Sequence, residues 1–434
     1  MKKTLLSILV GWGITSTAAA EDLYQVYQQA LQNDPTTLSA KANRDSAYSG
    51  IGLSKASLLP QLSLSLAADT RGGDADGDSN SITVNLQQSI YDYSNWKGYD
   101  KAELAATQAD ATFGLTKQNL IIRTSRAYFD ILQAQDDLEF AQAEKRAIAR
   151  QLEQTKQRFE VGLTAITDVH EAQAQFDTAV ASEISAQNAV EISKEALREI
   201  SGNYYSSIAA LNTTTFSASM PAPSEITGWV TRAEERNLEL LAAKLGVDIA
   251  KEDISIAKSG YYPTVSLNGQ YDSSDSDSSS TTSAGNSSNR VNTTYLQLKV
   301  DVPIHLGGSN NARVEQAKHG FIAQSEERER VHRSVVRSVR SNYFDVTASI
   351  SRIKALDQAV VSAESALKAT EAGFEVGTRT IVDVLQSTRN LYDAKRNLSG
   401  ARYNYILSIL NLKLAAGTLS EQDVLAINDG LTSA

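Results

Sequence analysis

An internal duplication is the feature that most constrains how this chain can fold. The sequence Tyr-Phe-Asp at 128–130 recurs at 343–345, and Phe-Glu-Val-Gly at 159–162 recurs at 374–377, each 215 residues further along the chain. Gly202 and Gly417 match at the same spacing, so the alignment needs no gap. Self-similarity on this scale indicates a duplicated supersecondary unit. The sequence therefore predicts two halves that carry the same elements in the same order.

A seven-residue period runs through both halves. In the second half a row of large residues is accompanied by a row of small ones: Val384, Leu391, Leu398, Tyr405 and Leu412 beside Ser387, Ala394, Ala401, Ser408 and Ala415. No proline lies between Trp96 and Glu160, and an uninterrupted helix of about 60 residues would be roughly 90 Å long. A strict seven-residue repeat predicts left-handed supercoiling. Each half should contain a long helical hairpin, with its turn at Gly162 or Gly377, because glycine readily ends a helix.

Before each hairpin the period changes from seven to two. Four segments alternate apolar and polar residues, which predicts strands with one apolar face: 62–66, 82–87, 265–268 and 296–302, with polar loops over 71–80 and 272–290. Such alternation is typical of outer-membrane strands, although a surface hairpin of a soluble protein has the same pattern. A sheet that spans lipid can have no free edge. If these strands span a membrane, two or three copies of the chain must associate.

The N-terminus has the pattern of a secretory leader. Lys2 and Lys3 precede a short apolar run, and the alanines before Glu21 form a small-residue cleavage site. We expect residues 1–20 to be removed, so that the mature chain begins at Glu21. The chain contains no cysteine, which excludes disulfides and a lipid-modified cysteine. Its formal net charge of −10 argues against nucleic-acid binding.

The hairpin turns and several other segments resemble the TolC family of outer-membrane export channels nearly end to end. The matching segments include 158–169, 377–384, 401–405 and 202–205, together with Pro60 and Pro263 before the strands. The resemblance implies an α+β membrane protein that forms a homotrimer. In it, a 12-stranded outer-membrane β-barrel, four strands from each chain, continues into a long periplasmic α-helical barrel with a mixed equatorial region.

Domain boundaries follow from the same resemblance. After the leader, 21–60 and 225–262 are expected to be upper helices of the α-barrel. Strands and extracellular loops would occupy 61–93 and 263–306, and the long hairpins 94–200 and 307–416. The equatorial region would comprise 201–224 and 417–434.

The resemblance implies a passive exit duct for multidrug efflux and type I protein secretion, located in the outer membrane with its helical barrel in the periplasm. Its implied partners are two further copies of the chain, a periplasmic membrane-fusion adaptor, an inner-membrane pump of the RND, ABC or MFS class, and outer-membrane lipid. No cofactor, metal or nucleic acid is expected. The alternative is a periplasmic coiled-coil adaptor or structural protein, which would share the leader and the heptads but would not need two strand pairs.

Residue roles are carried over from the family by position. Asp383 matches an acidic constriction, and Gln386 stands where close relatives have a second aspartate. A latch that closes the channel would involve Arg379, Thr167, Asp168, Gln151, Glu371 and Phe374. The family's tyrosine is replaced by Phe374, so a phenol cannot bond to Asp168. The adaptor would dock at the hairpin tips, namely Val161, Gly162, Leu163, Thr164, Val376, Gly377 and Thr378.

The sequence gives no support for an enzymatic function. The four histidines at 170, 305, 319 and 332 are scattered and form no H-E-x-x-H pair. Ser365 and Lys368 match S-x-x-K, but no K-T-G accompanies them, and within a helix the two simply share a face. We therefore predict no catalytic residues.

Overall fold

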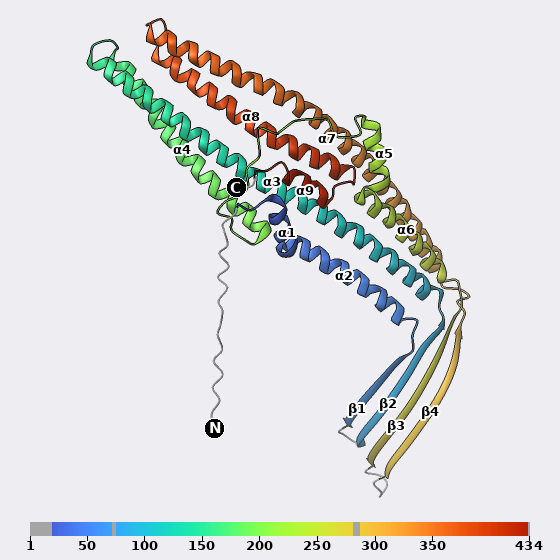
Figure 1. Cartoon of the computed structure of the whole chain (residues 1–434). Helices are drawn as coiled ribbons and strands as arrows, with labels where there is room; N and C mark the ends of the chain where they lie inside the picture. The colour runs from blue at the N-terminus through green and yellow to red at the C-terminus, as the bar shows by residue number, and fades with distance from the viewer. Residues whose placement is uncertain (1–19, 72–74, 281–286, 433–434) are drawn as a thin grey trace, which may run out of the picture. The chain divides into compact units, whose positions relative to one another are not determined.

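A computed structural model describes residues 20–71, 75–280 and 287–432 (Figure 1). The predicted leader lies outside these residues except for Ala20. The described helices are α1 (Leu23–Asn33), α2 (Pro35–Ala56), α3 (Tyr93–Glu160), α4 (Ile166–Ser201), α5 (Ile226–Arg236), α6 (Leu238–Ser259), α7 (Ser309–Glu375), α8 (Ile381–Ala415) and α9 (Glu421–Asn428). The described strands are β1 (Gln61–Arg71), β2 (Ala75–Tyr91), β3 (Thr264–Ser280) and β4 (Ser287–Asp301).

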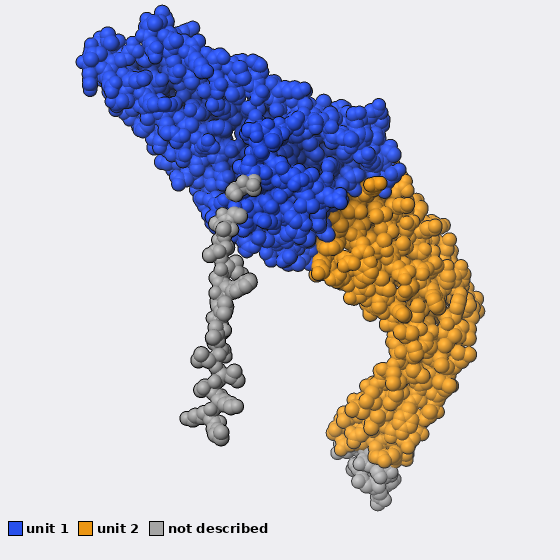
Figure 2. Space-filling model, viewed as in Figure 1, with its two compact units in different colours: residues 1–38, 116–235, 336–434 blue, residues 39–115, 236–335 orange. Residues whose placement is uncertain are grey.

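The chain divides into two compact units (Figure 2). Unit 1 comprises 1–38, 116–235 and 336–434, and unit 2 comprises 39–115 and 236–335. The long helices α3 and α7, of 68 and 67 residues, contribute to both units. The order helix, strand pair, long helix, shorter helix occurs once in each half of the chain, so the predicted duplication is confirmed.

Two helical hairpins, α3–α4 and α7–α8, form the larger part of unit 1, and their turns lie at the same end of the unit (Figure 1). Aromatic side chains link the hairpins further along. Phe129 of α3 stacks on Tyr403 of α8 with ring centroids 5.7 Å apart, and the Tyr403 hydroxyl donates to Asp136 at 2.8 Å. Tyr128, Phe129 and Tyr403 are almost fully buried. Burial on this scale stabilises each large side chain by about 1.5–3 kcal/mol relative to exposure.

The four strands of unit 2 form one antiparallel sheet in the order β1-β2-β3-β4. Residues that face each other across antiparallel strands lie on the same side of a sheet. Leu62 pairs with Leu86, Leu64 with Val84, Leu267 with Leu298 and Val265 with Val300, so one face is apolar across all four strands. This face is exposed: Leu62 retains 73% of its accessible surface and Leu298 65%. The opposite face carries polar pairs such as Thr83 and Asp272, whose side chains hydrogen bond at 2.7 Å.

The strands extend beyond the alternating segments that the sequence indicates. The predicted polar loops at 71–80 and 272–290 are wrong in their limits, because β2 begins at Ala75, β3 continues to Ser280 and β4 begins at Ser287. Almost every residue of the sequence there is polar, so no alternation marks the strands. Backbone pairing continues, as between Asp78 and Asp277.

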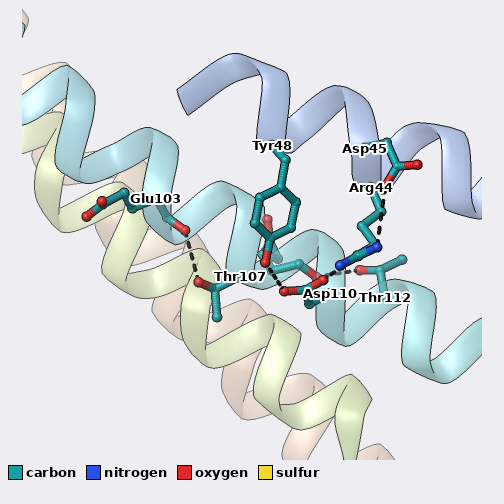
Figure 3. A network of polar contacts seen from close by, with 8 residues as sticks. Arg44, Asp45, Tyr48, Glu103, Thr107, Asp110 and Thr112 are labelled. Atoms are coloured by element: carbon teal, nitrogen blue, oxygen red, sulfur yellow. Dashed lines mark hydrogen bonds and ion pairs between the residues drawn. The ribbon is translucent and has the colours of Figure 1, made fainter. Parts of the chain in front are cut away.

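Helices of unit 2 are joined by charged and polar contacts. Arg44 of α2 donates to Asp110 of α3 at 2.6 Å, and Tyr48 also donates to this carboxylate (Figure 3). Lys101 of α3 pairs with Asp253 of α6 at 2.6 Å. Exposed pairs of this kind contribute at most about 1 kcal/mol each, so they fix how the helices face one another more than they stabilise them. No helix among the described residues combines the length and apolarity required to cross a membrane.

The segment at 207–212 holds both ends of the described chain. Glu21 forms a parallel bridge to Ile208, and Leu431 forms an antiparallel bridge to Leu211. The Thr432 amide donates to the Ala210 carbonyl at 2.8 Å. The N-terminal segment, the 207–212 segment and the C-terminal segment thus form a short irregular ribbon in unit 1.

Candidate gate at the hairpin tips

The two hairpin turns have the same backbone structure. Gly162 and Gly377 take φ of 76° and 80°, a left-handed conformation that costs other residues roughly 1–2 kcal/mol. Each glycine amide donates to a carbonyl three residues back, and the next amide donates to a carbonyl five residues back: Leu163 to Arg158 and Thr378 to Gly373, both at 2.8 Å. This pattern is the Schellman motif. The predicted turns at these glycines are confirmed.

The predicted docking residues lie on these turns and include large exposed apolar side chains. Val161, Leu163 and Val376 retain 70%, 69% and 75% of their accessible surface. Thr164 donates its hydroxyl to Asp168, and the Thr378 hydroxyl donates to the Gly373 carbonyl at 3.0 Å. Exposed apolar side chains grouped at the end of a hairpin are typical of a surface that contacts another protein.

The helices that follow the turns begin differently. Thr380 caps α8 in a capping box: the Asp383 amide donates to the Thr380 hydroxyl at 3.3 Å, and the Asp383 carboxylate accepts from the Thr380 amide at 2.9 Å. The matching cap residue of α4 is Ala165, which offers no side-chain acceptor. The same turn is therefore followed by a capped helix in one hairpin and an uncapped helix in the other.

The beginnings of α4 and α8 also differ in burial. Ile381 is 1% exposed and Val384 is fully buried in an apolar cluster with Ile148, Leu152 and Ala172 of the other hairpin. Ile166, which matches Ile381 in the duplication, is 46% exposed. The start of α8 is thus packed into the core of unit 1, whereas the start of α4 presents its apolar residue to the outside.

The predicted latch residues all lie near this end of the hairpins but do not bond to one another within the chain. Across the described residues, no hydrogen bond or ion pair joins any two of the set Arg379, Thr167, Asp168, Gln151, Glu371 and Phe374. Asp168 accepts from Thr164, and Gln151 Oε1 is buried with no hydrogen-bond partner. Gly373 makes room for Arg379, since a Cβ on Gly373 would come within 2.7 Å of the Arg379 Cγ.

One contact that the sequence did not predict joins the two hairpins near their tips. The Arg158 guanidinium at the end of α3 lies over the Phe374 ring near the end of α7, 4.6 Å from its centroid. A guanidinium over an aromatic face within about 6 Å is attracted by the ring's charge distribution. Arg158 lay within the matched tip sequence, but nothing in its spacing indicated a partner in the second half of the chain.

Asp383 is the acidic group expected at the constriction. Hydrogen bonds from the Thr380 amide and hydroxyl, both at 2.9 Å, lower the pKa of Asp383, and Arg379 acts in the same direction. The carboxylate is therefore ionised at neutral pH. Gln386, one turn further along α8, is exposed and donates to the Asn390 side chain at 2.9 Å. No group of three or more His, Asp or Glu side chains suited to a metal ion is found in the described part of the chain.

Comparison with known proteins places this fold in a family. The family model described as "Outer membrane efflux protein" matches residues 26–203 and 229–418. The chain belongs to this family.

Curated relatives match over nearly the whole chain. It is 47% identical to outer membrane protein TolC of Vibrio cholerae serotype O1, covering 99% of each protein. It is 45% identical to TolC of Escherichia coli strain K12, covering 99% of this chain and 90% of that one. Alkaline protease secretion protein AprF of Pseudomonas aeruginosa is 30% identical, covering 94% and 86% respectively.

Solved structures share the fold at low sequence identity. The outer membrane protein VceC of Vibrio cholerae matches with a TM-score of 0.75 and 19% identity, covering 91% of this chain and 96% of that one. The CmeC outer membrane channel of Campylobacter jejuni matches with a TM-score of 0.76 and 14% identity, covering 94% and 90%. The protein is therefore an outer-membrane efflux channel of the TolC type, and its family is one of non-enzymatic transport proteins.

Proposed function

We propose that three copies of the chain form a passive exit duct. The observation that carries this proposal is the exposed apolar face of the sheet. Four strands are too few to close a barrel, and among the described strands β1 and β4 each pair on one side only. Three copies would supply twelve strands, enough for an open lumen. The apolar face would then contact lipid and the polar face, with Thr83 and Asp272, would contact water.

The gate of the duct would lie where the hairpin tips of the three copies converge. Asp383 would supply one carboxylate from each copy near the axis, and three such charges focus a negative potential that favours cations. The lowered pKa of Asp383 supports this role, because the group is charged at neutral pH. Gln386 carries no charge, so we expect one acidic ring and weak block by multivalent cations.

Opening would separate the two hairpins of each copy. In place of a tyrosine bond to Asp168, the contact of Arg158 with the Phe374 ring supports a tie between the hairpins in the closed state. Arg379, Thr167, Gln151 and Glu371 would bond across the hairpins or to the neighbouring copy.

The exposed tip residues would receive the helical end of a periplasmic membrane-fusion adaptor. Val161, Leu163 and Val376 support this docking role through their large exposed apolar surface. An inner-membrane pump of the RND, ABC or MFS class would supply energy and substrate, since the family is one of non-enzymatic transport proteins.

Single-channel conductance in planar bilayers tests the duct. Detergent-purified wild-type protein should give discrete cation-selective steps that a trivalent cation reduces from the helical side. Asp383→Asn should weaken that block. Equal block in wild type and Asp383→Asn would contradict the assignment of the acidic ring.

Two further measurements test the latch and distinguish an outer-membrane duct from a periplasmic adaptor. Arg379→Ser should raise the conductance, and unchanged conductance would count against a latch role for Arg379. A well-folded protein that stays soluble without detergent and shows no conductance would contradict the duct and favour a periplasmic adaptor.

A further inference from the structure

Glu21, the residue at which the mature chain is predicted to begin, is fixed by its backbone in unit 1. Its amide donates to the Ser207 carbonyl at 3.3 Å, and its carbonyl accepts from the Ala209 amide at 3.1 Å. The buried Tyr128 hydroxyl donates to the Glu21 carbonyl at 3.2 Å and to the Ala209 carbonyl at 2.7 Å. The first residue after the leader is thus held in place rather than left as a loose end.

The Glu21 side chain lacks a cationic partner. Its Oε2 atom is buried without a hydrogen-bond partner, and no ion pair to Glu21 is found among the described residues. Burial raises the pKa of Glu21, a hydrogen bond with Gln29 lowers it and the neighbouring charge of Asp22 raises it again, with a raised pKa as the result. Tyr205, another titratable group nearby, donates to Gln29 at 2.8 Å. An uncompensated carboxylate in such a place is unfavourable.

The polar side chains next to Glu21 also form hydrogen bonds with other groups. Asp22 caps α1 by accepting from the Gln25 amide at 2.7 Å, and it accepts from the Asn428 side chain at 3.1 Å. Gln29 accepts from Asn203 at 2.7 Å as well as from Tyr205. What the site lacks is a positive charge beside the Glu21 backbone nitrogen.

We propose that the α-ammonium group created at Glu21 by leader removal is the missing charge of this site. Hydrolysis of the Ala20–Glu21 bond adds the water hydroxyl to the Ala20 carbonyl carbon and a proton to the Glu21 nitrogen. Protonation of that amine by solvent then gives the ammonium. The new group keeps its hydrogen bond to the Ser207 carbonyl and belongs to the residue that carries the Glu21 carboxylate, next to Asp22 in the chain. Cleavage would thereby stabilise the ribbon that also holds the C-terminal segment at Leu431.

The inference rests on the predicted cleavage site and not on the gate, so N-terminal sequencing of the purified protein is the first test. A mature chain that begins at Glu21 meets the requirement of the proposal, and one that begins elsewhere overturns it. The second test is the pKa of the α-amine, followed by NMR after selective ¹³C-dimethylation, which preserves the charge. An ordinary α-amine titrates at about 7.7–8.0, and we expect a rise of about one unit in the native protein.

A double-mutant cycle measures the coupling in stability. The first change of the cycle is the insertion of an asparagine after Ala20. It moves the ammonium by about 3.8 Å and does not create a new small-residue cleavage site. The other is Glu21→Ala, which removes the carboxylate and, unlike Glu21→Gln, cannot cyclise at the N-terminus.

The insertion should lower the melting temperature when Glu21 is present and change it much less in Glu21→Ala. The α-amine pKa should fall toward its ordinary value in Glu21→Ala. An insertion that costs the same in both backgrounds, or an ordinary amine pKa in the wild type, would overturn the proposal.

Discussion

The two hairpin tips share a sequence pattern and a turn geometry, yet they occupy different environments. Gly162 and Gly377 adopt nearly the same φ, and the same hydrogen bonds close both turns. At the start of α8, Thr380 caps the helix and Ile381 is buried, whereas α4 starts with exposed Ile166 and an alanine cap. The duplication thus preserved the local turn, while packing between the two hairpins buried the start of α8 and left the start of α4 exposed.

The largest expected effect comes from the buried isoleucine. Ile381→Ala should lower the free energy of unfolding by about 2–5 kcal/mol, because it leaves a cavity in a packed cluster. Ile166→Ala, at the matching position, should change it by no more than about 0.5 kcal/mol. Urea unfolding of the detergent-solubilised proteins checks both. An equal loss in the two variants would contradict the difference in burial between Ile381 and Ile166. It would show that another surface, such as a neighbouring copy of the chain, covers Ile166.

Exchanging the cap residues of α8 and α4 should change the stability of the protein in opposite directions. Thr380→Ala removes the cap of α8 and should cost about 1 kcal/mol, within the usual range of roughly 0.5–2 kcal/mol. Ala165→Thr gives α4 the cap that it lacks and should stabilise the protein by up to about 1 kcal/mol. Thermal unfolding of the two variants and of the double variant measures both. No gain in Ala165→Thr would mean that the Thr164–Asp168 bond already satisfies the start of α4.

The contact between hairpins should give a smaller, pairwise effect. Arg158→Gln and Phe374→Leu should be coupled by about 0.5–1 kcal/mol, the range for a partly exposed cation over a ring, as a double-mutant cycle in urea unfolding would measure. Phe159→Leu, at the position that matches Phe374 in the first hairpin, serves as the control. It should show little coupling to Arg158, whose guanidinium lies over the Phe374 ring. Additive losses of unfolding free energy in Arg158→Gln and Phe374→Leu would contradict the proposed tie between the hairpins.

The smallest expected effect is a pH dependence of the α8 cap. The pKa of Asp383 is lowered mainly by hydrogen bonds from Thr380, so its stabilising contribution is fully present above the unfolded-state value of about 3.9. It is lost as the pH falls through the lowered folded-state pKa. The stability difference between wild type and Thr380→Ala should therefore shrink below about pH 4. A difference that stays constant from neutral to acidic pH would show that the Thr380 hydroxyl does not stabilise the ionised Asp383 carboxylate, since the Thr380 amide bond to it remains in Thr380→Ala.

Much of the fold was predictable because its helices and strands follow from local sequence periodicity. The heptads marked the long helices, the glycines marked the turns and the alternation marked the four strands. Where successive residues of a strand are polar, as around Asp78 and Asp277, the sequence shows no alternation, and the predicted loops were too long. Of the candidate site, the sequence located the tips and the acid at the start of α8. It missed Arg158 over Phe374, since a contact between the two halves of the chain leaves no local pattern.

By itself the sequence determined the duplicated unit, the turns at Gly162 and Gly377 and the apolar side of each strand, because these depend on residues a few positions apart. Only the tertiary structure decided which of the two matching helix starts, that of α4 or that of α8, is buried. Ile381 and Ile166 occupy the same place in the pattern, and their burial depends on the neighbours that packing brings to them. Residues such as Ile148 and Leu152 lie far along the chain from Ile381, so no local rule distinguishes the two tips.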